Sequence, residues 1–336
     1  MPPVVLCRFT ENLIHISIVA MPKSSIEQEA RDLPNLIAPK ATSLIVTVFG
    51  DSLAPHGGHV WLGSLIELMA PLGLSERLVR TATNRLTNSG WLERLTKGRR
   101  SYFGLSETGR MRFEQATRRI YAETLPEWDG IWHLVVVAGT GMAPSQRESL
   151  RRELSWQGFG TIAPGVYAHP APDHAALIQA LAAVGIAEDA LILESRTAGL
   201  IGEDQPLQAL VARGWDLDRL AMAYNQFVDR FRTVRGLLGA RPRTRPEVAF
   251  VIRSILIHDY RRVMLHDPML PEALLPKAWP GSEARELCGD IYRCIWFPVE
   301  EHVTQRLETF EGRLLSPTLR GRFGGLPDTE LDGDAA

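Results

Sequence analysis

The sequence lacks the features that mark a disulfide-bonded, zinc-binding or membrane-spanning chain. Its three cysteines are too few for a disulfide framework, and Cys288 and Cys294 lie six positions apart, which is not a zinc-ligand spacing. No run of about 18 apolar residues predicts a transmembrane helix. These absences favour a protein of the reducing cytoplasm that holds no metal and has no membrane partner.

The start of the chain lacks the plan of a signal peptide, which needs a basic segment and a small-residue cleavage site. The apolar stretch 13–20 is interrupted by His15 and Ser17, and a more typical polar start follows at Met21. We therefore expect residues 1–35 to be a disordered leader or a wrongly assigned start.

Charge is unevenly distributed along the chain, although the net charge is only −2. Residues 75–122 contain 11 Lys and Arg against 4 Asp and Glu, an excess of +7, so the remainder carries −9. A local excess of this kind points to an anionic partner for one region only.

A short helix is predicted within SERLVRTATNRLTNSG, residues 75–90. Ser75 occupies the N-cap position, and Gly90 follows the last turn as a C′ glycine. The apolar side carries Leu78, Val79, Ala82 and Leu86. The opposite side carries Arg77, Arg80, Asn84, Thr87 and Asn88, with no carboxylate from 77 to 90. Such donors suit phosphates and base edges, although a solvated helix face would show a similar pattern.

The elements around this helix follow a definite order. Residues 41–53 fit a helix or a strand, and context favours the helix; a second helix is expected over 60–71, two strands turned at 97–99, and a helix over 108–123. This order is the plan of a winged helix-turn-helix domain, which binds double-stranded promoter DNA. The predicted DNA-binding residues are Arg77, Arg80, Thr81, Asn84, Arg85, Thr87, Lys97, Arg99 and Arg100.

The rest of the chain predicts two further domains, so that the fold class is α+β. Strand and helix patterns between about 128 and 194 alternate as βαββαβ, the ferredoxin-like arrangement. Beyond residue 205 the pattern is all-α. The expected domains are a winged helix (36–124), a central ferredoxin-like domain (125–203) and a helical C-terminal domain (204–318), followed by a flexible tail (319–336).

Three long stretches resemble the PaaX family of bacterial transcriptional repressors of phenylacetate catabolism. They are LSERLVRTATNRLTNSGWLERLTKGRRSYFGLSETG, LRRELSWQGFGTIAPGVYAHP and HDYRRVMLHDPMLPEALLPKAWPG. The resemblance covers about residues 40–317 and implies a homodimer that occupies promoter DNA. It implies no cofactor, and release from DNA by an aryl-acyl-CoA effector, typically phenylacetyl-CoA.

The resemblance also implies a central domain like that of the CRISPR adaptation nuclease, so a nuclease is an alternative function. Such enzymes hold metal with an Asp at the end of the first strand, where this sequence has Ala138 and Gly139. Gly139-Thr140-Gly141 could begin a dinucleotide motif, but the third motif position is Pro144 and no GK[ST] follows. A plain strand-to-helix turn is the better interpretation.

An effector site is predicted around HDYRR, residues 258–262. Its arginines would neutralise CoA phosphates, because guanidinium groups bind phosphate in a bidentate manner. The predicted effector-binding residues are His258, Tyr260, Arg261, Arg262 and Trp279. The alternative is a solvated helix face in which Asp259 pairs with an arginine, with Trp279 in the core.

Other functions stay open at this point. Trp128, Trp132, Trp156 and Tyr167 could line an aryl pocket, but core packing explains most of them better. A repressor could instead sense a free aromatic acid. An enzyme acting on acyl-CoA or nucleic acid is disfavoured because no nucleophile, metal set or acid–base pair stands out. The segments 217–238 and 110–121 are candidate dimer interfaces.

Overall fold

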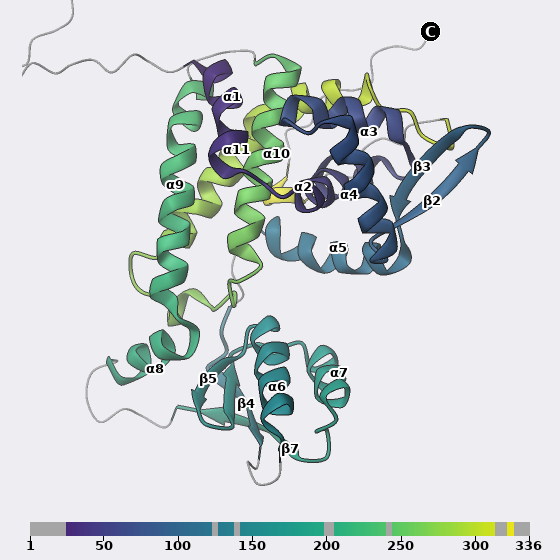
Figure 1. The fold of residues 1–336 in the computed structure, drawn as a ribbon. Coiled ribbons are helices and arrows are strands. Elements are labelled where there is room, and N and C mark those ends of the chain that lie inside the picture. The colour runs from purple at the N-terminus through teal and green to yellow at the C-terminus, as the bar shows by residue number, and fades with distance from the viewer. Residues whose placement is uncertain are drawn as a thin grey trace, which may run out of the picture.

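The computed structural model describes residues 25–122, 127–137, 142–197, 205–239, 244–312 and 321–325. Helices predominate over strands in these parts of the chain (Figure 1). The expected leader up to residue 24, and the stretch 138–141 that bears on the nuclease and dinucleotide alternatives, lie outside the described residues. No helix in the described ranges is long and apolar enough to cross a membrane.

The N-terminal part contains the predicted helices and hairpin, together with further short elements. Its elements are α1 (Ile26–Ile37), α2 (Ala41–Val48), the π-helix η1 (Phe49–Leu53), the 3-10 turn η2 (Ala54–His56), β1 (Val60–Trp61), α3 (Leu62–Met69), the 3-10 turn η3 (Ala70–Leu72), α4 (Glu76–Asn88), β2 (Leu92–Lys97), β3 (Arg100–Leu105) and α5 (Glu107–Ile120). The sequence predicts a helix from residue 60, whereas Val60 and Trp61 form a strand that pairs with β3. The sheet therefore has the strand order β1-β3-β2.

Helix α4 forms where the sequence predicts it because its N-terminus is capped and one side is apolar. Ser75 Oγ accepts a hydrogen bond from the Leu78 backbone N–H at 3.4 Å. The buried residues of α4 are Val79, Ala82, Thr83 and Leu86. Leu78, which was expected on the apolar side, is 45% exposed. It lies about 90° around the helix from the centre of the buried stripe, on the outward side.

Residues 25–35 belong to the folded chain, which corrects the expected leader. Ser25 Oγ accepts a hydrogen bond from the Gln28 backbone N–H at 3.2 Å and so caps α1. Ile26, Ala30 and Leu33 on α1 are buried. Because α1 packs against α10 (Pro246–Met264), it is part of the helical core and not a leader.

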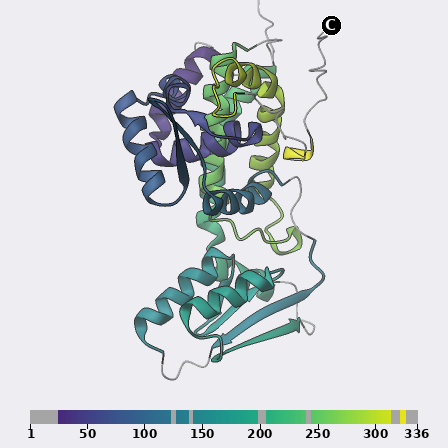
Figure 2. The same ribbon diagram turned by 90° about the vertical axis from the view of Figure 1, so that its right-hand side faces the viewer.

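The central part forms one four-stranded antiparallel sheet with two helices on one face (Figure 2). Its elements are β4 (Ile131–Val137), α6 (Pro144–Trp156), β5 (Gly160–Ala163), β6 (Val166–His169), α7 (His174–Val184) and β7 (Ala190–Arg196). The strand order is β5-β6-β4-β7. Alternate residues of the strands face the helices, so Val135 and Val137 of β4 pack with Leu150, Leu154 and Leu177.

The C-terminal part is helical, as predicted, and its helix α10 is surrounded by other helices. Its elements are α8 (Gln205–Trp215), α9 (Leu217–Gly239), α10, the 3-10 turn η4 (Glu272–Leu274), α11 (Pro280–Thr304) and the 3-10 turn η5 (Arg322–Gly324). Helices α1, α2, α9 and α11 pack around α10. The apolar side of α9, a candidate dimer interface in the sequence, is buried in this core. The dimer itself stays a prediction.

A buried ionic network joins the N-terminal and C-terminal parts. The Asp51 carboxylate forms an ion pair with Arg253, whose Nε lies 2.9 Å away, and accepts hydrogen bonds from Arg322 at 3.1 Å and from the Tyr121 and Tyr292 hydroxyls at 2.6 and 3.1 Å. Burial acts to raise the pKa of Asp51, but the two arginines and the hydroxyl donors outweigh it and hold the pKa below its usual value. Asp51 is therefore ionised at neutral pH.

The network continues along α10 and α11 and reaches the C-terminal segment. Arg253 also contacts Glu300 at 3.0 Å, and Glu300 contacts His56 at 3.0 Å. Arg322 and Phe323 are buried, although the sequence predicts a flexible tail from residue 319. The expected tail is therefore wrong for these residues, because Arg322 is held by Asp51 and by the Gly50 carbonyl.

We predict that Asp51→Asn lowers the free energy of unfolding by roughly 3–5 kcal/mol, because it leaves two buried arginines short of a counter-charge. Urea unfolding followed by circular dichroism measures the change. The matched control is Asp229→Asn, which removes an exposed carboxylate 4.0 Å from Arg232 and should change stability by less than about 1 kcal/mol. Equal losses in the two variants would contradict the role of Asp51.

Candidate functional site

The outward side of α4 presents a row of hydrogen-bond donors to solvent. Arg77, Arg80, Thr81, Asn84 and Arg85 are exposed, and Thr87 is half-buried. The side chains of Arg77, Asn84 and Arg85 have no partner among the described residues. Arg80 Nε donates to Glu76 at 2.8 Å, an exposed i,i+4 pair.

The two threonines of the predicted set are turned toward their own helix. Thr81 Oγ1 donates to the Arg77 carbonyl at 2.9 Å, and Thr87 Oγ1 donates to the Thr83 carbonyl at 3.0 Å. Both hydroxyls keep lone pairs that can accept a hydrogen bond, but Arg77, Asn84 and Arg85 are the free donors of this side.

The β2–β3 hairpin lies beside α4 and carries the other predicted cations (Figure 1). Arg99 at the turn is exposed and has no partner among the described residues. Arg100 lies 4.6 Å from the Trp61 ring and forms an ion pair with Glu308. Lys97 Nζ lies 5.4 Å from the Phe310 ring. Of the three predicted cations, only Arg99 is therefore unengaged.

A short C-terminal segment, residues 308–311, lies along β1 and contacts the hairpin close to its turn. The Trp61 N–H donates to the Glu308 carbonyl at 2.8 Å, and the Phe310 N–H donates to the His59 carbonyl at 2.8 Å. Val60 and Thr309 form an antiparallel bridge between them. The segment thus adds to the β1 edge of the sheet.

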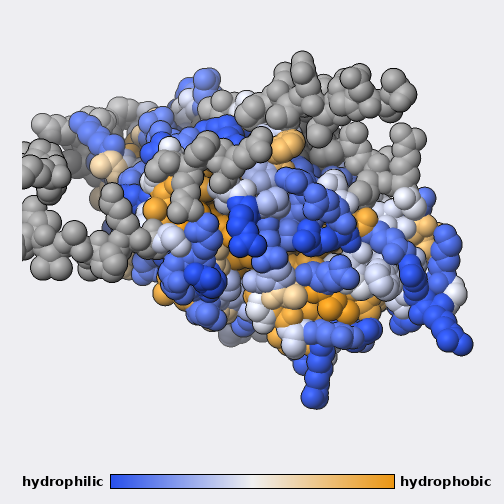
Figure 3. All heavy atoms as spheres, turned by 90° about the horizontal axis from the view of Figure 1, so that it is seen from above, coloured by the Kyte–Doolittle hydropathy of each residue, from blue (hydrophilic) through white to orange (hydrophobic). Residues whose placement is uncertain are grey.

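Seen from above in Figure 3, the right-hand edge of the molecule, where β2 and β3 lie, is mostly hydrophilic.

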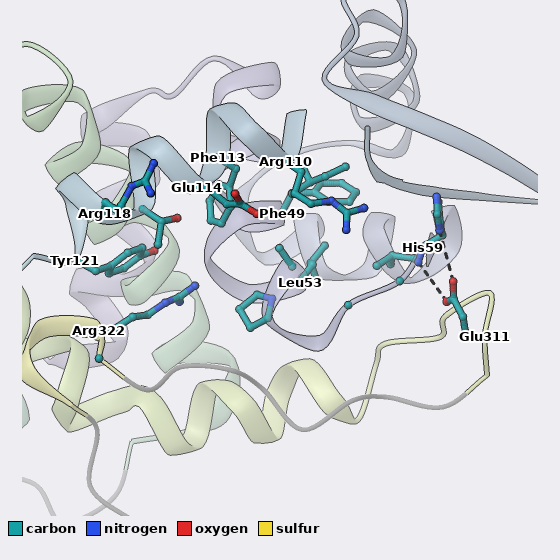
Figure 4. A pocket seen from close by; sticks show the side chains of 18 of the residues that line it. Phe49, Leu53, His59, Arg110, Phe113, Glu114, Arg118, Tyr121, Glu311 and Arg322 are labelled. Atoms are coloured by element: carbon teal, nitrogen blue, oxygen red, sulfur yellow. Dashed lines mark hydrogen bonds and ion pairs between the residues drawn. The ribbon is translucent and has the colours of Figure 1, made fainter. Parts of the chain in front are cut away.

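A groove of about 960 Å³ adjoins the hairpin between α5, η1 and the C-terminal segment (Figure 4). Side chains of α5 form one side, and Glu311 and Arg322 come from the C-terminal chain. Its lining includes Phe49, Leu53, His59, Arg110, Phe113, Arg118 and Glu311. The volume is at the upper end of the range typical of ligand pockets.

The groove combines apolar surface with free polar groups. Phe49 and Leu53 are buried and Phe113 is half-buried, so they supply an apolar floor. Arg110 and Arg118 are exposed and have no partner within the described ranges. These cations, beside an apolar floor, can bind an anion that carries an apolar group.

Glu311 links the groove to the hairpin segment. Its carboxylate accepts from the His59 backbone N–H at 3.3 Å and lies 3.6 Å from His59 Nδ1 (Figure 4). Glu311 follows directly on Phe310, which contacts Lys97. A ligand that displaced Glu311 would therefore act on the segment that holds the hairpin.

Most of the predicted effector residues of α10 are buried or hydrogen-bonded within the protein. His258 is buried, and its Nδ1 lies 3.2 Å from Thr47 Oγ1. Arg261 donates to the Ser43 hydroxyl at 2.9 Å, whereas Arg262 is exposed. Helix α2 packs against α10, so His258 and Arg261 contact other parts of the protein, whereas Arg262 faces solvent.

The remaining members of that predicted set are core residues. Tyr260 is fully buried, and its ring lies 5.3 Å from that of Phe227. Trp279 packs edge-on against Tyr224 at 6.0 Å, which agrees with the core alternative. Asp259 forms an ion pair with Arg230 at 2.7 Å. An arginine partner for Asp259 is what the alternative interpretation of HDYRR predicts.

Sequence reasoning missed the groove residues and the C-terminal segment. Arg110 and Arg118 belong to the local charge excess, but the sequence indicates only a candidate dimer interface for their segment, 110–121. Glu308 and Glu311 carry no local signal, because their partners Arg100 and His59 lie more than 200 positions away.

A second cavity of about 600 Å³ lies on the central sheet face opposite α6 and α7. Trp132 and Leu134 of β4 line it together with Trp215 of α8, with Arg196 and Arg213 among its other lining residues. Of the four predicted aryl-pocket residues, Trp132 lines this cavity. The Trp128 ring packs edge-on against the Trp132 ring, with their centroids 5.2 Å apart. Tyr167 is in the helix-side core and Trp156 is exposed.

Comparison with known proteins identifies the family. The model for PaaX-like protein matches residues 40–109, that for the PaaX protein central Cas2-like domain matches 125–207, and that for the PaaX-like protein C-terminal domain matches 215–305. Transcriptional repressor PaaX of Escherichia coli (strain K12) is 39% identical over 295 residues, which cover 87% of this chain and 92% of that protein. The chain belongs to the PaaX family.

The family assignment confirms the resemblance seen in the sequence. The match to a Cas2-like central domain agrees with the nuclease-like central domain that the resemblance implies. The E. coli relative is a transcriptional repressor by name, which agrees with the predicted class of regulator. The uncharacterized protein Rv0674 from Mycobacterium tuberculosis shares the fold, with a TM-score of 0.53 and 24% identity over 79% of this chain and 99% of that chain.

The buried histidine of α10 predicts a pH-dependent stability. Burial, together with Arg261 and Arg262, lowers the pKa of His258 from 6.5 to about 4. Below pH 6.5 the unfolded chain binds a proton that folded His258 does not, so the free energy of unfolding falls as the pH falls toward 4. The slope from this residue is about 1.4 kcal/mol per pH unit.

His258→Asn should therefore unfold with a shallower pH dependence between pH 6.5 and 4 than the parent chain, whatever its absolute stability. Urea titrations at several pH values give both slopes. His266→Asn, at an exposed histidine, is the control and should keep the parent slope. An unchanged slope in His258→Asn would mean that His258 accepts a proton in the folded state.

Proposed function

We propose that this PaaX-family chain is a transcriptional repressor that binds double-stranded promoter DNA, acting in the cytoplasm on an operon for phenylacetate-type catabolism. The observation that carries the proposal is the outward side of α4, whose free donors Arg77, Asn84 and Arg85 lie beside an exposed basic hairpin. The name of the E. coli relative, a transcriptional repressor, supports the same function.

We propose that α3, α4 and the β2–β3 hairpin act as a winged helix-turn-helix, with α4 as the recognition helix in the major groove. The order of the elements and the cap at Ser75 support this assignment. The B-DNA major groove admits one α-helix, and arginine there binds guanine O6 and N7 in a bidentate manner. Arg99 at the hairpin turn would contact the phosphate backbone.

For the central part we propose the ferredoxin-like arrangement, supported by the element order βαββαβ and the antiparallel sheet order. We keep the expected domains of about 36–124, 125–203 and 204–318, with residues 25–35 and 321–325 added to the helical body they pack on. A homodimer would suit a palindromic operator, and the exposed Leu191 and Leu193 on the open sheet face offer apolar surface for it.

The effector we propose is an aryl-acyl-CoA, such as phenylacetyl-CoA, bound in the groove along α5. Arg110 and Arg118 would contact its phosphates, and the floor at Phe49, Leu53 and Phe113 would contact apolar parts of the molecule. This location replaces the α10 set, whose His258 and Tyr260 are buried. A free aromatic acid remains the alternative, since it would use the floor and one arginine.

The proposed release mechanism runs through residues 308–311. Effector entry would compete with the Glu311–His59 contact, and the same segment holds Arg100 through Glu308. A shift of this segment would change the position of the hairpin relative to α4. The two DNA-contacting elements would then no longer fit one duplex together.

We predict that Arg77→Ala weakens binding to the promoter beside this gene by about 1–3 kcal/mol and relaxes its sequence preference, if Arg77 reads a base edge. Arg99→Ala should weaken specific and random DNA alike and reduce the salt slope by about one. Mobility-shift titrations at several salt concentrations measure both effects.

The control for both variants is Arg219→Ala, which removes an exposed arginine from α9 and should leave DNA binding unchanged. If Arg77→Ala and Arg99→Ala bind as tightly as the control does, the assigned DNA surface is wrong. If no chain binds the promoter specifically, the repressor function itself is wrong.

Arg118→Ala should bind promoter DNA like the parent chain in the absence of effector, but should need about tenfold more phenylacetyl-CoA for release, because one charged contact to phosphate is lost. Parallel titration with phenylacetate separates the CoA ester from the free acid. Release of Arg118→Ala at the parent concentration would place the effector elsewhere.

A further inference from the structure

Three metal-binding side chains from three separate elements meet at one edge of the central sheet. His133 lies on β4, His174 is the first residue of α7, and Glu194 lies on β7. Each side chain offers one ligand atom, and these three atoms lie within 4.8 Å of one another. The central sheet brings these residues together, although they are far apart in the sequence.

The fold fixes the positions of these groups. His133 and Glu194 are directly paired in the antiparallel β4–β7 ladder, so their side chains lie on the same face of the sheet. Asp173 caps α7 by accepting from the Ala175 and Ala176 N–H groups, which sets the first turn. The His174 ring is thereby placed with its centroid 4.9 Å from that of His133.

Hydrogen bonding within the protein leaves His133 unsatisfied. Its side chain is only 13% exposed, and its Nδ1 is buried with no hydrogen-bond partner among the described residues. Glu194 Oε1 lies 3.9 Å from this Nδ1, which is too long for a hydrogen bond. Two ligands of one tetrahedral zinc ion lie about 3.4 Å apart, so small side-chain movements would let one ion bridge both atoms.

We propose that His133, His174 and Glu194 bind a divalent transition-metal ion of the zinc class. Two imidazoles and one carboxylate form a ligand set that zinc uses when a fourth position is left for water or another ligand. Nitrogen ligands disfavour Mg²⁺ and Ca²⁺, which prefer oxygen. The exposed His174 and Glu194 give the ion access from solvent.

The site lies directly behind the cavity of the central sheet. Successive residues of a strand point to opposite faces, so the neighbours of the ligands, Trp132 and Ser195, point into that cavity. Trp132 and Ser195 are themselves a ladder pair. A bound ion would tie β4, β7 and α7 together and stiffen this wall of the cavity.

The test uses the full chain after chelator treatment, titrated with Zn²⁺ in competition with a chromogenic chelator. The parent chain should bind one ion more tightly than the rest, and His174→Asn and Glu194→Gln should each weaken that binding by about tenfold or more. His266→Asn, at an exposed histidine outside the cluster, is the control and should bind like the parent. Both ligand variants change exposed side chains, so they should fold normally.

Two further measurements separate this site from other surface ligands. Zn²⁺ should raise the Tm of the parent chain and of His266→Asn, but not of His174→Asn, because the ion binds only the folded site. Co²⁺ should give the intense visible bands of a four-coordinate ion. The proposal would be overturned if Zn²⁺ affinity and Tm shift were the same in all four chains. It would also be overturned if Co²⁺ gave only the weak bands of a six-coordinate ion.

Discussion

The buried carboxylate of Asp51 is the constraint on which the arrangement of this protein depends. An ionised group inside a protein needs counter-charges, and Asp51 obtains them from α10 and from the C-terminal segment, through Arg253 and Arg322. Tyr121, just beyond α5, and Tyr292 on α11 complete the shell. Elements from both ends of the chain must therefore come together before this charge is satisfied. Helix α4, which carries the proposed DNA contacts, packs against α2, and α2 packs against α10.

The exposed ion pairs around the proposed DNA surface have a different energetic character. Arg80 with Glu76, and Arg100 with Glu308, are solvent-exposed pairs, which are each worth about 0–1 kcal/mol. Phosphates can displace such carboxylates at little cost. The buried network sets the frame of the protein, whereas these weak pairs can exchange their partners when a polyanion arrives.

Local signals explain which elements were predictable from the sequence. Ser75 caps α4, the Gly98 turn joins β2 to β3, and the central part has the predicted order of strands and helices, although β7 extends to Arg196. Long-range pairing explains what was missed. The enclosed position of α10 depends on α1, α2, α9 and α11 packing around it, and a helix surrounded on every side shows little amphipathic pattern.

The candidate site follows the same division. The α4 donors could be selected from helical spacing, because the apolar stripe of α4 determines which side of the helix is buried. The groove could not, because it forms only when residues 308–311 return to β1 and Arg322 reaches Asp51. That return places one short segment in contact with both the groove, through Glu311, and the hairpin, through Glu308 and Phe310. Ligand binding and DNA binding would thus compete for the position of the same few residues, and no separate relay between the two surfaces is needed.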